Sequence, residues 1–281
     1  MSFDSVNAPF GSAPAPFGYD PTPRPRYLGY AGFVTTPACW DDVIQQFLAV
    51  APPGCVGAMG RVLHVPSYGY ELSERAKNFD LLDEAAEALA LSDCTVIGQV
   101  GTNWVHCNGT TPDDIAAYCD RLSEKVGATF VMAGHSIVEA LRSIGAERIT
   151  VSNGYYRDDW RDGINGYLTA AGFEVVASGH MRDQGIHPSL EAQMEVEAVT
   201  HWDHSDRECV QTILAAHEAA PDADVVVQTG QGMKIVPHIP TLEAIVGKPV
   251  IASDNSLFWN MLRHLDLGLP VRGHGSLLAG L

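Results

Sequence analysis

Three polar segments of the 281-residue chain follow apolar runs and carry residue types that bind an anion. They are residues 101–103 (GTN), 152–156 (SNGYY) and 228–232 (QTGQG). Glycine permits positive φ and close backbone approach, so successive N–H groups can converge on an anion. Hydroxyl, amide and phenol groups add further hydrogen bonds. We expect these segments to form one uncharged site for a carboxylate, although each also has the composition of an ordinary turn.

Proton transfer at such a site needs an acid or a base, and the sequence offers two candidates. His135 ends an Ala-Gly-His turn before an expected helix, where its ring could titrate near neutral pH. Cys107 follows His106, which could lower the pKa of the thiol, but adjacent residues of an extended segment point in opposite directions. Helix capping for His135 and burial as a small apolar side chain for Cys107 are the alternatives.

Four further histidines, His180, His187, His201 and His204, lie within residues 179–204. The last two have the spacing HxxH, which resembles a metal-binding pair but lacks the glutamate of HExxH. We therefore expect no bound metal and no other cofactor.

Strands and helices that alternate along the chain must position these residues. The alternation predicts an α/β fold with a parallel sheet. The expected strands are residues 27–35, 94–100, 129–132, 148–152, 173–177, 224–228 and 249–252. The expected helices are residues 41–50, 80–91, 111–126, 136–144, 160–171, 206–219, 241–246 and 256–265.

The chain also has the pattern of an internal duplication. Residues 95–103 match residues 224–232 at three positions, Gln99 and Gln228 among them, and residues 33–42 match 150–159 at a valine and a pair of aspartates. The first pair of segments is 129 residues apart and the second 117, so the second copy is longer. A duplication predicts two similar lobes with a ligand between their strand ends, whereas a chance likeness of buried strands predicts nothing.

Composition limits the possible classes of function. The chain has 34 acidic and 17 basic residues and a net charge of −17, which argues against nucleic acid and anionic membranes as partners. No apolar run reaches membrane-spanning length, and the N-terminus does not have the pattern of a secretory signal, so we expect a cytoplasmic protein. Residues 1–26 contain six prolines, and we expect an extended arm that favours, weakly, a homo-oligomer.

Four segments together resemble the aspartate/glutamate racemase superfamily and, within it, the arylmalonate decarboxylase and maleate isomerase branch. They are residues 101–103, 136–155 (SIVEALRSIGAERITVSNGY), 220–232 (APDADVVVQTGQG) and 249–259 (PVIASDNSLFW). The resemblance implies two pseudo-symmetric α/β lobes, each with a mainly parallel sheet flanked by helices, and an active site in the cleft between them. We accordingly divide the chain into an arm (1–26), a first lobe (27–137, completed by 250–281) and a second lobe (138–249).

The sequence departs from the superfamily at two positions. Racemases and maleate isomerases resemble two-thiol enzymes with a cysteine at the end of the equivalent strand of each lobe, and arylmalonate decarboxylases keep the second. Here the two positions are Gly101 and Thr229. A threonine hydroxyl is a far weaker acid than a thiol, so two-base racemisation and isomerisation through a thiol adduct are disfavoured. The hypothesis that follows is that His135 replaces the thiols, and unchanged turnover of His135→Ala would refute it.

The resemblance keeps the anion site, in which hydroxyl, amide and backbone N–H groups hold a carboxylate and stabilise an enediolate-like state. The expected catalytic residues are His135, Tyr155, Thr229 and Cys107, and the expected substrate-binding residues are Gly101, Thr102, Asn103, Tyr70, Gly230 and Gln231. Tyr70, with its neighbour Tyr68, fits core packing equally well. We expect a cofactor-independent lyase that decarboxylates or eliminates from a small carboxylate. An isomerase or hydrolase with the same pocket, or a non-catalytic carboxylate-binding protein, is the alternative.

Overall fold

The computed structural model describes residues 26–37, 39, 41–65 and 71–281. The expected arm therefore lies, apart from Arg26, outside the described residues, as do Tyr68 and Tyr70. Among the residues described, no helix combines the length and the apolar character needed to cross a lipid bilayer.

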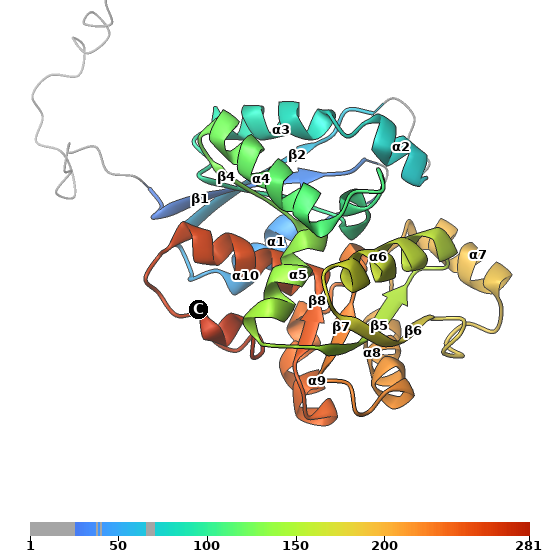
Figure 1. Cartoon of the computed structure of the whole chain (residues 1–281). Coiled ribbons are helices and arrows are strands. Elements are labelled where there is room, and N and C mark those ends of the chain that lie inside the picture. The colour runs from blue at the N-terminus through green and yellow to red at the C-terminus, as the bar shows by residue number, and fades with distance from the viewer. Residues whose placement is uncertain (1–25, 38, 40, 66–70) are drawn as a thin grey trace, which may run out of the picture.

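Two four-stranded parallel sheets form the centre of the molecule (Figure 1). The first has the order β2-β1-β3-β4, with β1 Gly29–Thr35, β2 Val56–Val62, β3 Val96–Gln99 and β4 Thr129–Met132. The second has the order β6-β5-β7-β8, with β5 Arg148–Gly154, β6 Glu174–His180, β7 Val225–Gln228 and β8 Val250–Ala252. Helices cover both faces, which is why β3, β7 and β8 are buried along their whole length. The predicted fold class is confirmed.

Helices connect the strands and begin at local sequence signals. Thr111 and Asp114 form a capping box at the start of α4, and Ser205 and Glu208 form another at the start of α8. The helices are α1 Val43–Val50, α2 Leu72–Lys77, α3 Leu81–Ala90, α4 Pro112–Val126, α5 Ala133–Ser143, α6 Asp158–Ala170, α7 Leu190–Thr200, α8 Asp206–Ala219, α9 Ile239–Val246 and α10 Ser253–Leu265. Short 3-10 helices follow β3 (Thr102–Val105) and β7 (Gln231–Met233).

The predicted elements are present, and the structure adds β2, α2 and α7. β2 has the sequence VGAMGRV, in which two glycines interrupt the apolar pattern of a strand. α7 has the sequence LEAQMEVEAVT and buries Gln193 and Glu197, so it has no apolar stripe that a sequence pattern could detect. α10 begins at Ser253, three residues before the predicted start.

The two sheets repeat one topology, because in each lobe the first strand in sequence pairs with the second and the third. Val34 pairs with Gln99 in the first sheet, and Ser152 pairs with Gln228 in the second. The equivalent of Val34 is therefore Ser152, so the predicted alignment of Val34 with Val151 was wrong by one residue. In a strand, this shift exchanges the two faces.

The C-terminal helix α10 returns from the second sheet to the first lobe. α3 and α4 cover one face of the first sheet, and α1 and α10 cover the other, while α5 packs beside α10 (Figure 1). Phe258 of α10 makes edge contacts with Phe33 of β1 and Phe47 of α1, at 6.5 and 5.5 Å between ring centroids. The predicted division of the chain assigns residues 250–281 to the first lobe, and this packing agrees with that assignment. The division itself stays a prediction.

Candidate active site

A pocket of about 90 Å³ lies where the two lobes meet. The first lobe contributes Gly101, Thr102 and Asn103, which follow β3, and the second contributes Tyr155, Gln231 and other residues that follow β5 and β7. These positions are the carboxyl ends of parallel strands, where ligands of α/β proteins bind. The structure thus brings together the three segments that the sequence singled out.

Two hydrogen bonds join the turns across the lobes. Thr102 Oγ1 donates to the carbonyl oxygen of Thr229 at 2.6 Å, and the backbone N–H of Gly101 donates to Gln231 Oε1 at 3.4 Å. Gly101 has φ +101°, a conformation that only glycine adopts without strain. The glycine is therefore required by the turn that directs Thr102 and Asn103 toward the second lobe.

Gln231 belongs to a buried polar cluster behind the pocket. Ser253 Oγ donates to Gln231 Oε1 at 2.7 Å, and Gln231 Nε2 donates to Asp254 Oδ1. Burial raises the pKa of Asp254 well above its usual value. The cluster holds the Gln231 amide in place.

The hydroxyl of Thr229, the residue expected at the second thiol position, is engaged by its own lobe. Oγ1 accepts a hydrogen bond from Asn153 Nδ2 at 3.3 Å and donates to the carbonyl oxygen of Ser152 at 3.5 Å. Thr229 faces a separate recess of about 10 Å³ rather than the larger pocket. Gly230 packs so closely on Tyr155 that a Cβ would lie 2.8 Å from the ring. Neither residue presents a side chain to the pocket.

Tyr155 anchors an aromatic wall of the pocket. Its hydroxyl oxygen accepts a hydrogen bond from the N–H of Gly232 at 2.9 Å, and burial raises its pKa well above the usual value, so the phenol stays neutral. Trp160 and Trp202 make edge contacts with its ring, and Tyr156 stacks on Trp202. The sequence pattern did not single out the two tryptophans. Trp202 lies in the loop between α7 and α8.

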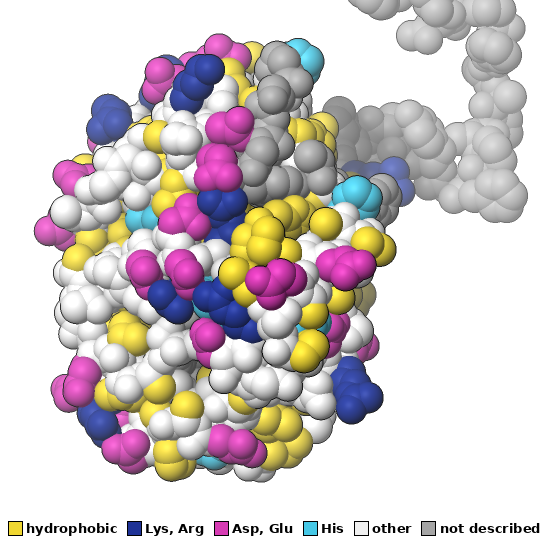
Figure 2. Space-filling model, turned by 90° about the vertical axis from the view of Figure 1, so that its right-hand side faces the viewer, with side chains coloured by type: hydrophobic (Ala, Val, Ile, Leu, Met, Phe, Trp, Pro, Cys, Tyr) yellow, Lys and Arg dark blue, Asp and Glu magenta, His cyan; other side chains and the backbone are white. Residues whose placement is uncertain are grey.

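Charged side chains of both signs in the pocket wall, the cations Arg75 and Lys234 and the acidic residues Asp41, Asp42 and Asp203, correct the expectation of an uncharged site. The Arg75 guanidinium lies over the ring of Trp160, at 4.7 Å from its centroid. Lys234 Nζ lies 2.9 Å from Asp203 and 3.8 Å from Asp42. Burial opposes the charge of Lys234, but these partners raise its pKa overall. On the face seen in Figure 2, basic side chains alternate with acidic ones at the height where the lobes meet.

An ion pair beside the pocket connects the two lobes. Arg157, which precedes α6, lies 2.5 Å from the carboxylate of Glu71, which precedes α2, and 3.0 Å from that of Asp159. This pair links the second lobe to the first at the pocket rim.

The structure does not bring the two predicted proton-transfer residues to the pocket. His135 is buried in α5, with Nδ1 2.9 Å from the hydroxyl of Tyr167, and burial lowers its pKa. Cys107 donates to the carbonyl oxygen of Trp104 at 3.3 Å, and burial raises its pKa to about 11. Burial also lowers the pKa of His106 to about 4. The His106 imidazole is therefore not the charged neighbour that would activate the Cys107 thiol.

Several other titratable groups do line the pocket. Three of them, the thiol of Cys39 and the carboxyl groups of Asp41 and Asp42, lie after β1, and His201 and Asp203 lie after α7. Burial is the largest influence on Asp41 and raises its pKa, although its hydrogen bond from the N–H of Val43 acts in the opposite direction. The sequence contained one signal that could have identified Cys39 and Asp41. Like the segment at residues 101–103, they follow an apolar run that forms a strand of the first sheet.

Comparison with known proteins shows the family to which the chain belongs. The sequence model described as arylmalonate decarboxylase matches residues 70–278. The chain belongs to the arylmalonate decarboxylase family. Membership places it among enzymes of the decarboxylase and isomerase type. Arylmalonate decarboxylase from Bordetella bronchiseptica is 27% identical over 193 residues, which cover 68% of this chain and 74% of that protein.

Solved structures of this family and of maleate isomerases share the fold. A crystal structure of arylmalonate decarboxylase has a TM-score of 0.69 at 19% identity and covers 89% of this chain and 98% of its own. Maleate isomerase from Pseudomonas putida S16 has a TM-score of 0.72 at 20% identity, with 90% and 98% covered. Maleate cis-trans isomerase from Nocardia farcinica has a TM-score of 0.69 at 20% identity and the same coverage. The predicted resemblance is confirmed.

Proposed function

We propose that this family member decarboxylates a small dicarboxylate in the interlobe pocket. The observation that carries the proposal is the wall itself, in which Thr102, Asn103 and Tyr155 stand with the cations of Arg75 and Lys234. A cation and several neutral donors suit the carboxylate that the product retains. The aromatic and apolar surface of Val100 and Trp202 suits the carboxylate that leaves. A charged carboxylate is poorly solvated beside this surface, and its loss as neutral carbon dioxide removes that cost.

In the proposed reaction the bond between the α-carbon and the leaving carboxylate breaks. Its electron pair remains on the α-carbon and delocalises into the retained carboxylate, which becomes an enediolate. Preorganised donors aimed at such charge contribute about 2.7–4 kcal/mol each. Asn103 and Lys234 are the groups we assign to this task, because the Thr102 hydroxyl already donates to the carbonyl oxygen of Thr229.

A proton must then reach the α-carbon, and we assign this step to the loop after β1. Asp41 lines the pocket, and burial raises its pKa above that of a free carboxyl group, which is the direction that a general acid requires. Cys39 lines the same side. A role for His135 would require its ring to leave Tyr167. Isomerisation through a thiol adduct at the position of Thr229 has no support, because that side chain is a hydroxyl engaged by its own lobe.

The proposal is tested by offering substituted malonates, maleate and simple monocarboxylates to the purified protein. Calorimetry measures binding, and product analysis in deuterated water measures carbon dioxide release and deuterium at the α-carbon. We expect a malonate to yield one equivalent of carbon dioxide and a singly deuterated monocarboxylate. Conversion of maleate alone would indicate an isomerase, and binding of every ligand without turnover would indicate a carboxylate-binding protein; either result overturns the proposal.

Variants of the pocket locate the proton donor. We expect Asp41→Asn or Cys39→Ser to lower kcat at least about tenfold while binding persists, as for loss of a general acid. His135→Gln is the matched control, because His135 is buried in the first lobe away from the pocket. Loss of turnover in His135→Gln, with Asp41→Asn and Cys39→Ser unaffected, would return the role to His135.

A further inference from the structure

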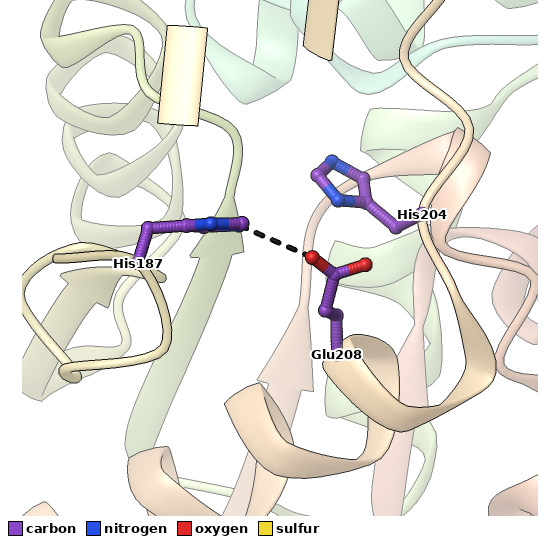
Figure 3. Close-up of side chains that lie close together, drawn as sticks. All are labelled: His187, His204 and Glu208. Atoms are coloured by element: carbon purple, nitrogen blue, oxygen red, sulfur yellow. Dashed lines mark ion pairs between the residues drawn. The ribbon is translucent and has the colours of Figure 1, made fainter. Parts of the chain in front are cut away.

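Three side chains that can ligate a metal converge beside the start of α8, outside the pocket (Figure 3). His187 follows β6, His204 precedes α8, and Glu208 lies in the first turn of that helix. One ligand atom from each residue lies within 4.8 Å of the others. Two imidazoles and a carboxylate are a donor set typical of zinc.

Both imidazoles are buried and carry nitrogens that the fold leaves unsatisfied. The side chain of His204 has 0% exposure, and neither ring nitrogen has a hydrogen-bond partner among the described residues. Nε2 of His187 likewise has no hydrogen-bond partner in the described part of the chain, although it lies 3.3 Å from Glu208 Oε1. Buried nitrogens of this kind are costly to leave unpaired, so their convergence points to a shared ligand.

Glu208 is oriented for this role by the cap of its own helix. Its Oε2 accepts hydrogen bonds from the backbone N–H and the hydroxyl of Ser205, at 2.9 and 2.7 Å, which leaves Oε1 directed at His187.

A second carboxyl group, that of Glu197, lies beside the ring of His204. Figure 3 shows one ring nitrogen of His204 turned toward Glu208 and the other turned away. Its Nε2 lies 3.9 Å from Oε1 of the fully buried Glu197, which Gln193 and the N–H of Tyr156 hold in place. A carboxyl group beside a histidine ligand is a common outer-shell arrangement in metal sites, and Glu197 is placed where a small shift of the ring would bring the two groups together.

We infer that His187, His204 and Glu208 bind one divalent transition-metal ion, with Zn²⁺ the best match to the donor set. This ion fastens residues 187–204, which contain α7, to α8. The same stretch carries Trp202 and Asp203 into the pocket wall, so the ion supports the pocket without taking part in its chemistry. The inference does not depend on the proposed reaction. It also departs from the expectation of a metal-free protein. The HxxH spacing pairs His204 with His201, whereas the structure brings His204 to His187 and Glu208.

The test uses full-length protein freed of any histidine tag and stripped with a chelator. Calorimetric titration with ZnCl₂ should show one equivalent bound, and Co²⁺ should give visible absorption typical of a four- or five-coordinate site. His187→Gln and Glu208→Gln should each weaken zinc binding by more than about 100-fold. Glu208→Gln is informative because glutamine also closes a capping box, so the helix start is kept while the charged ligand is lost.

His201→Asn is the matched control, since His201 is exposed and has φ +52°, which asparagine tolerates. We expect its zinc affinity to equal that of the wild type. Hydrogen exchange provides a second measure: zinc should slow exchange across residues 187–204 in the wild type but not in Glu208→Gln. The inference is overturned if the wild type binds no zinc, if binding survives both ligand substitutions, or if His201→Asn loses it as well.

Discussion

Replacing Glu197 by glutamine should abolish one component of the pH dependence of stability. Burial raises the pKa of Glu197 to about 8 from the ordinary 4.5, with smaller opposing effects from Gln193 and Tyr156. The folded protein therefore retains a proton that the unfolded chain has already released. The resulting stabilisation is complete below about pH 4.5 and is lost as the pH rises toward 8.

Linkage gives the magnitude. One retained proton changes the free energy of unfolding by about 1.4 kcal/mol per pH unit. Between about pH 6 and about pH 7.5 the wild type should therefore lose about 2 kcal/mol relative to Glu197→Gln. Glutamine preserves the shape, and its amide nitrogen replaces Oε2, which has no hydrogen-bond partner among the described residues. Groups common to both proteins cancel in the difference.

Urea denaturation at several pH values provides the assay, with a chelator present because a metal on His204 would alter the neighbouring carboxyl. Glu195→Gln is the matched control, since Glu195 is an exposed carboxylate on the same helix. Its stability should remain parallel to that of the wild type. Parallel curves for the wild type and Glu197→Gln would show that Glu197 is already ionised in the folded protein and would refute the reasoning.

Three further substitutions test the pocket. Gly101→Ala should lower the free energy of unfolding by about 1–3 kcal/mol, because alanine is strained at φ +101°. An unchanged denaturation midpoint would show that no such strain arises. Tyr155→Phe leaves the N–H of Gly232 without its acceptor and should cost about 1–3 kcal/mol in urea denaturation, together with a lower kcat. Lys234→Met should raise KM for a carboxylate about tenfold or more at little cost in stability, because its partner Asp203 is half-exposed; equal KM values would place the carboxylate elsewhere.

The alternation of strands and helices could be predicted because its signals are local. The valines of β7 and the capping box at Thr111 act within a few residues of themselves. The meeting of the 101–103 and 228–232 turns also followed, since like ends of parallel strands lie at one edge and the two lobes repeat one topology. α7 could not be predicted, because its buried residues are the polar Gln193 and Glu197, whose partners come from other elements.

Short-range patterns were sufficient to predict most of the elements, the family and the glycine turns of the pocket. Which titratable groups face that pocket depends instead on tertiary packing. His135 was expected in a turn before a helix, but it lies in the first turn of α5 and its ring packs on Tyr167, whereas Asp41 and Lys234 reach the pocket from distant parts of the chain. The direction of a side chain and its pKa depend on what the fold buries beside it, and packing brings those neighbours from far along the sequence.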